Sequence, residues 1–397
     1  MKGAVMGEMN TRVSSPITVR SHADLARMEP GLTVVKLGSS VVTTDVGRLD
    51  RDVLRDVAKF ASRRLEERGQ TIIISSGAVA AGIGQLGLGR RPNTLPELQA
   101  LAAVGQGRLM AQWGEAFAEH KREVAQVLVS AEDFRDRRRY LNMRYTFEKL
   151  FEHGVVPIVN ENDTITIEEL RFGDNDGLAQ LVAIKMMADL LVFMTTAEGL
   201  YGRDGKEVVR VVEQIGEDVL SLALDTRSSR GSGGMRSKLE AARTAAHAGI
   251  PVVIAPGKGR GTLNKLLQGE QVGTLILAEG PARYNRRQRF IAFSRLEPRG
   301  RLMVDAGAQK ALVTGKKSLL PAGITACEGE IEPGYVVDVV GPSGQVIARG
   351  ITNYSGGDID RIKGRQSSEI ADVLGHCDYT EVIHRDNLVV MEHETPQ

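Results

Sequence analysis

The sequence is poor in cysteine, with only Cys327 and Cys377 among its 397 residues. Neither belongs to a CxxC pair or lies near two spaced histidines. The chain therefore has neither the framework of a disulfide-stabilised protein nor the ligands of a structural zinc site. This cysteine usage is typical of a reducing compartment, and we expect the protein in the cytoplasm.

Long apolar runs and an excess of one charge are also absent. No apolar stretch approaches the ~20 residues that span a bilayer, and the N-terminus lacks the apolar segment of a secretory signal, so we expect no membrane contact. The 51 Lys and Arg residues nearly cancel the 50 Asp and Glu residues. This balance argues against a protein that binds nucleic acid mainly through charge, and the 42% hydrophobic content excludes a wholly disordered chain.

From Thr33 onward, short β-branched runs alternate with longer segments of helical periodicity. The runs are continuously apolar, as in strands that are covered on both faces. Between them, residues such as Val53, Leu54, Val57 and Ala61 repeat at the spacing of one helix face. The alternation predicts an α/β fold, a mostly parallel open sheet with helices on both faces. The expected strands are Thr33 to Leu37, Thr71 to Ile74, Val124 to Val129, Val155 to Val159, Leu190 to Phe193 and Pro251 to Ile254.

The pattern changes after about Leu277. Residues 281–299 contain six arginines, and residues 300–380 form short runs divided by turn sequences such as Glu332-Pro333-Gly334. We interpret 31–280 as the α/β domain, 281–299 as a linker and 300–380 as a small β-rich domain. Residues 1–30 and 381–397 are expected to be tails, the first of them flexible.

Small polar residues follow the first two predicted strands, at the edge where open α/β sheets bind ligands. The first strand carries Lys36 into a turn that includes Gly38 and Ser39, and the second ends at Ser76 and Gly77. Backbone N–H groups in such turns suit an anion, and a lysine within an apolar run is costly unless it is paired or functional. The alternative for Lys36 is a lysine on an edge strand that faces solvent.

Gly82, Gly84 and Gly87 match the GxGxxG pattern of dinucleotide-binding folds. They follow a helical turn instead of a strand, and they lead to Arg90-Arg91-Pro92, so termination of a helix is the favoured role. The sequence also contains no GxxxxGK[ST] motif. Any nucleotide site is therefore not a P-loop.

Two clusters of acids and amides lie in the α/β region. Asn160 to Asp163 directly follow the fourth predicted strand, and Asp174 to Asp176 precede a helix. Each cluster alone suits an Asx turn or a helix N-cap, with Asp174 or Asn175 as the capping residue. Two such clusters at ligand-facing strand ends favour a site for a small polar substrate.

The glycine-rich segment from Ser229 to Lys238 precedes an alanine-rich helix. Such a loop at a helix N-terminus suits a polyphosphate, and Lys238 can place charge on a transferring group; the alternative is a flexible surface loop. Together with Lys36 and the two clusters, this inventory favours phosphoryl transfer, which depends on positioning and on charge neutralisation. Mg²⁺ would then be held largely by nucleotide phosphates.

Taken in order and at their intervals, these motifs resemble those of the glutamate 5-kinases, a branch of the amino acid kinase family. These enzymes use ATP to phosphorylate the side-chain carboxylate of L-glutamate, the first step of proline biosynthesis. The resemblance covers Thr33 to about Gly375, and the segments from Val304 to Ala308 and from Ser318 to Ile324 resemble the PUA domain of many bacterial members. The kinase motifs are Lys36 to Ser40, Ser76 to Ala78, Ala102 to Gln106, Asn160 to Asp163, Gly173 to Asp176 and Ser232 to Lys238.

The resemblance implies a role for each candidate residue. Lys36 and Lys238 would contact ATP and the transferring phosphoryl group, and Asp176 would orient both lysines. Three further residues would bind glutamate: Ser76, Asp163 and Asn175. Thr196 stands where the family usually has aspartate. The implied ATP-binding residues are Lys36, Thr195, Thr196, Ser232, Gly233, Gly234, Met235, Arg236, Ser237 and Lys238.

The resemblance also implies a homo-oligomer that proline inhibits. Two other interpretations stay open. A sibling kinase acting on acetylglutamate, aspartate, carbamate or uridylate would share the lysines but not the two acid–amide clusters beside a PUA-like domain. An RNA-binding protein is the second alternative, because PUA domains elsewhere bind RNA; a linker or subunit contact is favoured for the basic stretch that contains Arg283, Arg286, Arg287 and Arg289.

Overall fold

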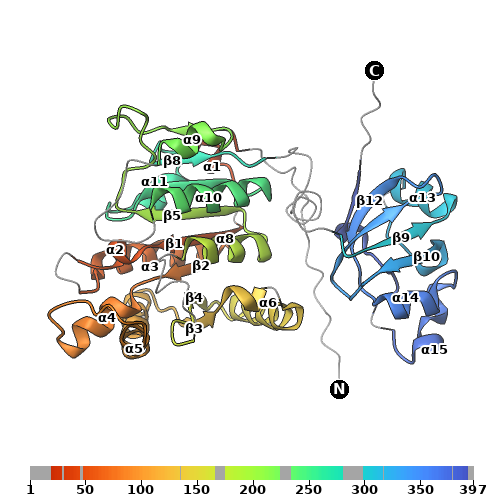
Figure 1. The fold of residues 1–397 in the computed structure, drawn as a ribbon, viewed down its shortest axis with the longest axis horizontal. Helices are drawn as coiled ribbons and strands as arrows, with labels where there is room; N and C mark the ends of the chain where they lie inside the picture. The colour runs from red at the N-terminus through yellow and green to blue at the C-terminus, as the bar shows by residue number, and fades with distance from the viewer. Residues whose placement is uncertain are drawn as a thin grey trace.

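The computed structural model describes residues 19–28, 31–44, 48–134, 136–165, 175–223, 234–279, 298–315, 317–377 and 379–391. These residues form an eight-stranded sheet and a five-stranded sheet (Figure 1). The large sheet has a hydrophobic core on each face, and the small sheet has a core of its own. Most of the expected linker, including the basic stretch from Arg283 to Arg289, lies outside the described residues.

The large sheet has the strand order β3-β4-β2-β1-β5-β7-β8-β6. Neighbouring strands are parallel except for the antiparallel pair β7 and β8. All six strands expected from apolar runs are present, so the mostly parallel α/β fold is confirmed. The strands are β1 (Leu32–Leu37), β2 (Gln70–Ser75), β3 (Val124–Val129), β4 (Val156–Glu161), β5 (Leu190–Thr195), β6 (Val211–Val212), β7 (Val252–Pro256) and β8 (Thr274–Ile276).

Strand β3 departs from the expectation that every apolar run is covered on both faces. It lies at the end of the strand order and pairs only with β4 among the described strands. Leu128 in β3 is 37% exposed, whereas the six residues of β1 are all buried. An apolar run therefore identified the strand but not its position at the sheet edge.

Helices cover both faces of the sheet (Figure 1). Val35 and Ile73 face a core that includes residues of α2, α3, α4, α5 and α11, while Val34 and Ile72 face a core built with α6, α8, α9 and α10. The alternation of side chains along each strand thus supplies both cores. The helices are α1 (His22–Leu25), α2 (Ser39–Val42), α3 (Arg51–Glu66), α4 (Ala78–Leu86), α5 (Leu95–Ala118), α6 (Arg137–Glu152), α8 (Asp176–Lys185), α9 (Glu217–Ser221), α10 (Met235–His247) and α11 (Thr262–Leu267), with a 3₁₀ turn at Ala131–Phe134.

Helix α3 shows how local sequence sets an element. Asp50 is its N-cap, and the carboxylate accepts the backbone N–H of Val53 at 3.3 Å. Val53, Leu54 and Val57 are buried against the sheet, as their spacing predicts. The cap fixes the start of the helix, and the apolar stripe fixes which face turns inward.

The expectation of a flexible tail over residues 1–30 is wrong for the part that the structure describes. Residues 22–25 form α1, and Val19, His22 and Leu25 are buried. Leu25 belongs to the same core as the helix α11 residue Leu263. Helix α1 has only four residues, which is too few for a helical period to be recognised in the sequence. Residues 1–18 lie outside the described ranges.

Of the GxGxxG glycines, Gly87 ends a helix, as expected, and Gly82 packs against a neighbouring helix. Gly87, with φ of 65°, is the C-cap of α4. Gly82 faces helix α5, where a Cβ atom would lie 2.1 Å from the carbonyl oxygen of Leu101. On α5, a Cβ atom at Gly105 would lie 1.8 Å from the carbonyl oxygen of Ala78. The two helices approach so closely because both contact positions are glycine.

The second domain is β-rich, as the turn pattern predicts. Its strand order is β10-β9-β11-β12-β13, and Leu302, Val337 and Val339 lie in its core. Strand β13 pairs with β12, and Val382 is fully buried, so the domain continues beyond residue 380, where the sequence predicted a tail. The elements are β9 (Gly300–Val304), β10 (Ile324–Gly329), β11 (Val336–Val340), β12 (Val346–Ile351), β13 (Leu388–Val390), α13 (Ala306–Val313), α14 (Gly356–Ile362) and α15 (Ile370–Leu374), with 3₁₀ turns at Pro321–Gly323, Ser367–Glu369 and Arg385–Asn387.

Candidate active site

Lys36 lies in β1, a central strand between β2 and β5. It is 1% exposed. This position rules out the alternative of an edge-strand lysine that faces solvent. A buried ammonium group requires a compensating charge, and Lys36 has one: its Nζ lies 2.6 Å from Oδ1 of Asp176.

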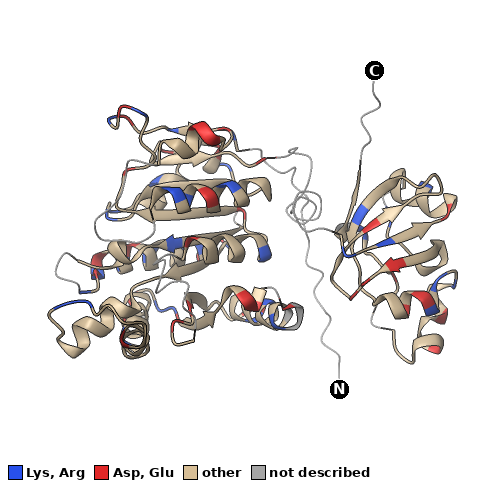
Figure 2. Ribbon diagram, in the orientation of Figure 1, with Lys and Arg blue, Asp and Glu red and all other residues tan. Residues whose placement is uncertain are grey.

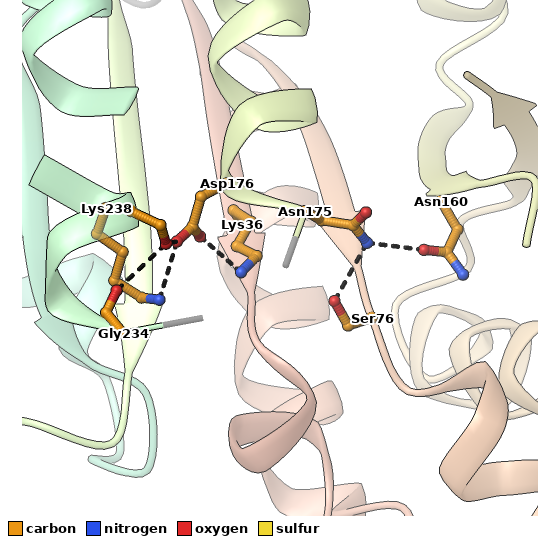
Figure 3. Close-up of polar contacts among 8 residues, drawn as sticks. Lys36, Ser76, Asn160, Asn175, Asp176, Gly234 and Lys238 are labelled. Atoms are coloured by element: carbon orange, nitrogen blue, oxygen red, sulfur yellow. Dashed lines mark hydrogen bonds and ion pairs between the residues drawn. The ribbon is translucent and has the colours of Figure 1, made fainter. Parts of the chain in front are cut away.

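Asp176 joins the two lysines on which phosphoryl transfer would depend. Its second oxygen, Oδ2, lies 3.0 Å from Nζ of Lys238, so the ammonium groups of Lys36 and Lys238 meet on one carboxylate (Figure 3). Asp176 is the first residue of α8, and Lys238 comes from α10, which packs beside it. Residues that are distant in the sequence therefore converge at the carboxyl edge of the sheet.

Ser237 also holds this carboxylate in place. Its hydroxyl donates to Oδ2 of Asp176 at 2.8 Å and lies 3.2 Å from the carbonyl oxygen of Gly234. Gly234 is the N-cap of α10 and makes no side-chain cap. The start of α10 therefore faces the Lys36–Asp176–Lys238 cluster.

Asn175 does not cap its helix through its side chain, although it occupies the N-cap position of α8. Its amide Nδ2 instead donates to Oγ of Ser76 at 3.1 Å and to Oδ1 of Asn160 at 2.9 Å (Figure 3). All three side chains are buried. The geometry therefore disagrees with simple helix capping and joins the second acid–amide cluster to the ends of β2 and β4.

The amide network continues to Gln106 of α5, a residue to which the sequence assigned no role. Nδ2 of Asn160 donates to Oε1 of Gln106 at 3.0 Å. Nε2 of Gln106 and Oδ1 of Asn175 are buried and have no hydrogen-bond partner among the described residues. Such atoms are costly to leave unsatisfied, so this donor and this acceptor are suited to a polar ligand. The sequence placed Gln106 in the motif from Ala102 to Gln106, but the motif did not show what this side chain contacts.

Ser76 owes its position to the residues beside it. The indole N–H of Trp113, a fully buried residue of α5, donates to Oγ of Ser75 at 3.0 Å. Gly77 has φ of 114°, and a Cβ atom there would lie 2.8 Å from Cγ2 of Val42. Glycine at residue 77 allows the backbone to turn next to Val42, and this turn sets the position of Ser76.

The other predicted residues are placed as follows. Asp163 is buried just after β4. Thr195 ends β5 half-buried, while Thr196 is exposed. Arg236 is exposed, and its Nε lies 3.0 Å from Oε1 of Glu240. Met235 is half-buried at the start of α10. Ser232, Gly233, Gly173 and Asp174 lie outside the described residues.

The part of the chain that contains this constellation matches a known family. The amino acid kinase family matches residues 31–256, the part of the chain that contains both lysines and Asp176. The chain belongs to the amino acid kinase family. The PUA domain family matches residues 300–374, which form most of the second, β-rich part.

Curated relatives of this amino acid kinase span nearly the whole chain. Glutamate 5-kinase of Caldanaerobacter subterraneus subsp. tengcongensis is 42% identical over 90% of this chain and 97% of its own. Glutamate 5-kinase of Pelobacter propionicus is 45% identical over the same shares. That of Moorella thermoacetica is 42% identical over 92% of this chain and 98% of its own.

Similarity to solved structures is more remote. A structure of N-acetylglutamate synthase from Neisseria gonorrhoeae with coenzyme A and L-arginine matches 65% of this chain and 64% of its own at 15% identity, with a TM-score of 0.47. That likeness is too distant to bear on function. Among the helices that the structure describes, none has the length and hydropathy needed to cross a bilayer.

Proposed function

We propose that this amino acid kinase transfers the γ-phosphoryl group of ATP to the side-chain carboxylate of L-glutamate. The product is L-glutamyl 5-phosphate, and the reaction is the first step of proline biosynthesis. The observation that carries the proposal is the pair of buried ammonium groups, Lys36 and Lys238, on the two oxygens of Asp176. The substrate follows from the curated glutamate 5-kinases, which match over at least 90% of this chain.

The acceptor needs no general base. A glutamate side chain has a pKa of about 4.3, so its carboxylate is already ionised at neutral pH. One carboxylate oxygen forms a bond to the γ-phosphorus while the bond from that phosphorus to the bridging oxygen of ADP breaks. The main obstacle is the repulsion between two anions, and two fixed ammonium groups reduce it.

Each site residue has a role in this proposal. Lys36 and Lys238 bind the transferring phosphoryl group. Asp176 holds both ammonium groups in position before ATP binds. Ser76 and Asn175 contact glutamate, and Asp163 pairs with its α-ammonium group. The open donor of Gln106 adds a polar contact that the sequence did not predict. ATP lies against Thr195, Thr196 and the segment from Ser232 to Lys238.

Mg²⁺ fits this site through the nucleotide and not through a protein cage. The carboxylate of Asp176 is engaged by Lys36, Lys238 and Ser237. It therefore has little capacity to coordinate a cation directly. The nucleotide phosphates would hold Mg²⁺, and it would neutralise part of their charge.

The proposal has three further features, of which the resemblance implies the first two and the cysteine usage favours the third. Proline inhibits by competing near the glutamate site, the enzyme is a homo-oligomer, and it works in the cytoplasm. The domain division, with the kinase over 31–280 and the linker over 281–299, belongs to the same proposal.

The test is glutamate-dependent release of ADP, with the acyl phosphate trapped by hydroxylamine as a hydroxamate. We expect turnover with L-glutamate and little turnover with aspartate or acetylglutamate, and we expect proline to lower the rate. Preferred turnover of acetylglutamate, aspartate, carbamate or uridylate would contradict the proposed substrate and favour a sibling kinase.

A further inference from the structure

A cavity lies at the amino ends of the strands of the large sheet, whereas the lysine cluster lies at their carboxyl ends. Its volume is about 300 Å³, and its lining includes Thr33 of β1 and Leu190 of β5, which lie near the amino ends of these strands. Helices α3 and α11 supply other walls. The candidate active site uses the carboxyl ends of the same strands, so the cavity and the active site are distinct.

Arg64 of α3 contributes a buried, positively charged guanidinium to the lining of this cavity. It is 8% exposed, and its Nε has no hydrogen-bond partner among the described residues. Its Nη2 donates to the carbonyl oxygen of Gly31 at 3.3 Å. A buried guanidinium with an unused N–H donor is costly unless a ligand can accept from it.

The position of Arg64 is built into the backbone around it. Its guanidinium lies against Gly69, where a Cβ atom would be 2.8 Å from both Cζ and Nη2. A side chain at residue 69 would therefore displace the guanidinium. The backbone N–H of Gly69 also donates to the carbonyl oxygen of Arg64 at 2.7 Å, which closes the end of α3 around it.

Two carboxylates also line the cavity, and each has another contact. Glu67 accepts from Nε of Arg63 at 2.9 Å and lies 3.7 Å from Nη1 of Arg64. Asp189 accepts the backbone N–H of Leu32 at 2.7 Å. Burial lowers the pKa of Arg64, and the charges of Glu67 and Asp189 act in the opposite direction. The guanidinium stays charged, because an arginine does not lose its proton in proteins.

The remaining walls are mixed: Leu25, Phe60 and Leu267 are apolar, and Thr33, Asn264 and Gln268 are polar. Small-molecule sites commonly measure about 300–1,000 Å³, so this cavity suits a ligand at the small end of that range. A guanidinium matches the geometry of a carboxylate, and the apolar part of the lining favours an organic body over an inorganic ion. We propose that the cavity binds a small monocarboxylate with a short aliphatic body, its carboxylate paired with the guanidinium of Arg64.

The two sites share strand β1. Lys36 lies three positions after Thr33, which is about 10 Å along the strand at 3.3 Å per residue. A ligand of the cavity would therefore contact the strand that carries the catalytic lysine. The binding proposal does not depend on the proposed kinase activity, because its test measures binding directly.

Isothermal titration calorimetry on the full chain, with four probes, tests the proposal. The probes are 3-methylbutanoate, its neutral analogue 3-methylbutan-1-ol, its cationic analogue 3-methylbutan-1-amine, and inorganic phosphate. We expect saturable binding of the carboxylate, at least ~10-fold weaker binding of the alcohol because the charge-assisted hydrogen bond is lost, and none of the amine. No binding of 3-methylbutanoate, or equal binding of acid and alcohol, would overturn the proposal, and tighter binding of phosphate would overturn the carboxylate assignment.

Binding measurements on variants test whether the carboxylate of 3-methylbutanoate lies beside Arg64. Arg64→Met keeps an apolar stem without the donor, and Gly69→Ala displaces the guanidinium while leaving it in the chain. We expect each to weaken 3-methylbutanoate binding at least ~10-fold. Arg55→Met, on the exposed side of the same helix and paired with Glu119, is the matched control and should bind as wild type does. Unchanged binding in Gly69→Ala would place the ligand elsewhere, whether or not Arg64→Met folds.

Discussion

At the scale of single residues, Lys238 is the side chain whose removal best separates chemistry from binding. Its Nζ lies 3.0 Å from Oδ2 of Asp176 on the α10 side of the site, away from Ser76 and Asn175. We expect Lys238→Ala to lower kcat by ~10²–10³-fold, because charge on the transferring group is no longer neutralised, and to leave the KM for glutamate nearly unchanged. Steady-state kinetics measure both. Turnover close to wild type would remove this lysine from the mechanism.

A matched control for this prediction is Lys149→Ala. Lys149 lies on α6 and is exposed, with its Nζ 2.7 Å from Oε2 of Glu152. An exposed ion pair contributes little to stability, so both kcat and KM should stay at wild-type values in this variant. A similar loss of kcat in both variants would indicate a general effect of charge and not a local one.

Residue types at strand ends predicted much of the site but not its contacts. Lys36 could be selected because an unpaired charge in an apolar run is unfavourable, and its partner Asp176 came from the resemblance. Asn160 was one of four polar residues in a row, and Gln106 one residue of a helix. That these two amides bond to each other depends on the packing of α5 beside β4, which no local pattern contains.

At the scale of elements, the contact between α4 and α5 depends on glycine. We expect Gly105→Ala to lower the free energy of unfolding by about 3 kcal/mol or more, because its Cβ would lie 1.8 Å from the carbonyl oxygen of Ala78 and the helices must separate. Activity should fall as well, since Gln106 adjoins the substituted residue. Urea unfolding and steady-state kinetics measure the two effects.

Gly107→Ala is the control for this substitution. Gly107 lies on the same helix, and a Cβ atom there would meet nothing within 4 Å. Alanine has a higher helix propensity than glycine, so this variant should be more stable by about 0.5–1 kcal/mol. Equal destabilisation at both positions would show that helix propensity, and not the close contact with α4, sets the effect.

The docking of α1 predicts a pH effect on stability. Burial lowers the pKa of His22 from its ordinary 6.5, with a smaller contribution in the same direction from the charge of Arg210 and an opposing hydrogen bond to the backbone of Val272. The folded chain therefore holds His22 neutral at pH values where the unfolded chain protonates it. Stability from this group is present above pH 6.5 and is lost as the pH falls below that value toward the folded pKa.

The measurement is urea unfolding between pH 7.5 and pH 5 for the wild type and for His22→Leu. The slope of unfolding free energy against pH reports the difference in bound protons between the two states. We expect a smaller slope in the variant over this window. Identical slopes would mean that His22 titrates alike in the folded and unfolded chains, and that α1 does not bury it in solution.

Helices and strands were predicted where an apolar run or a periodic pattern is long enough to recognise, and were missed where the element has only a few residues. Continuous apolar runs revealed β1, β2, β4, β5 and β7, because strands covered on both faces need no polar residues. Strands β6 and β8 have two and three residues, too few for any period, and the four residues of α1 raise the same difficulty. These short elements form because the larger core offers them an apolar surface.

At the scale of the whole molecule, the hydrophobic cores of the two domains are made of separate parts of the chain. Within the described ranges, the clusters on the two faces of the large sheet use residues up to Leu277, and the cluster of the second domain begins at Leu302. A change in composition predicted this division, because a linker needs no core positions. The end of the second domain was harder to predict, since β13 follows a long stretch without strand periodicity.

The charge of the second domain bears on the RNA-binding alternative. Residues 300–380 contain 8 Lys and Arg but 10 Asp and Glu, and Figure 2 shows both signs distributed over this part. A cavity of about 420 Å³ in the same domain is lined by Glu330, Glu332 and Asp360. Carboxylates at such a site repel phosphates, whereas proteins that bind nucleic acid concentrate lysine and arginine on one face.

We therefore expect the full chain to bind RNA weakly and without specificity. Fluorescence anisotropy of a labelled single strand and a labelled duplex, at 50 mM and 200 mM salt, measures this. A protein that neutralises six or more phosphates would lose about 10³-fold or more in affinity between these concentrations. Tight binding with that salt dependence would contradict this expectation and restore RNA binding as a function of the chain. The basic stretch from Arg283 to Arg289 would then be the first candidate for the contacts.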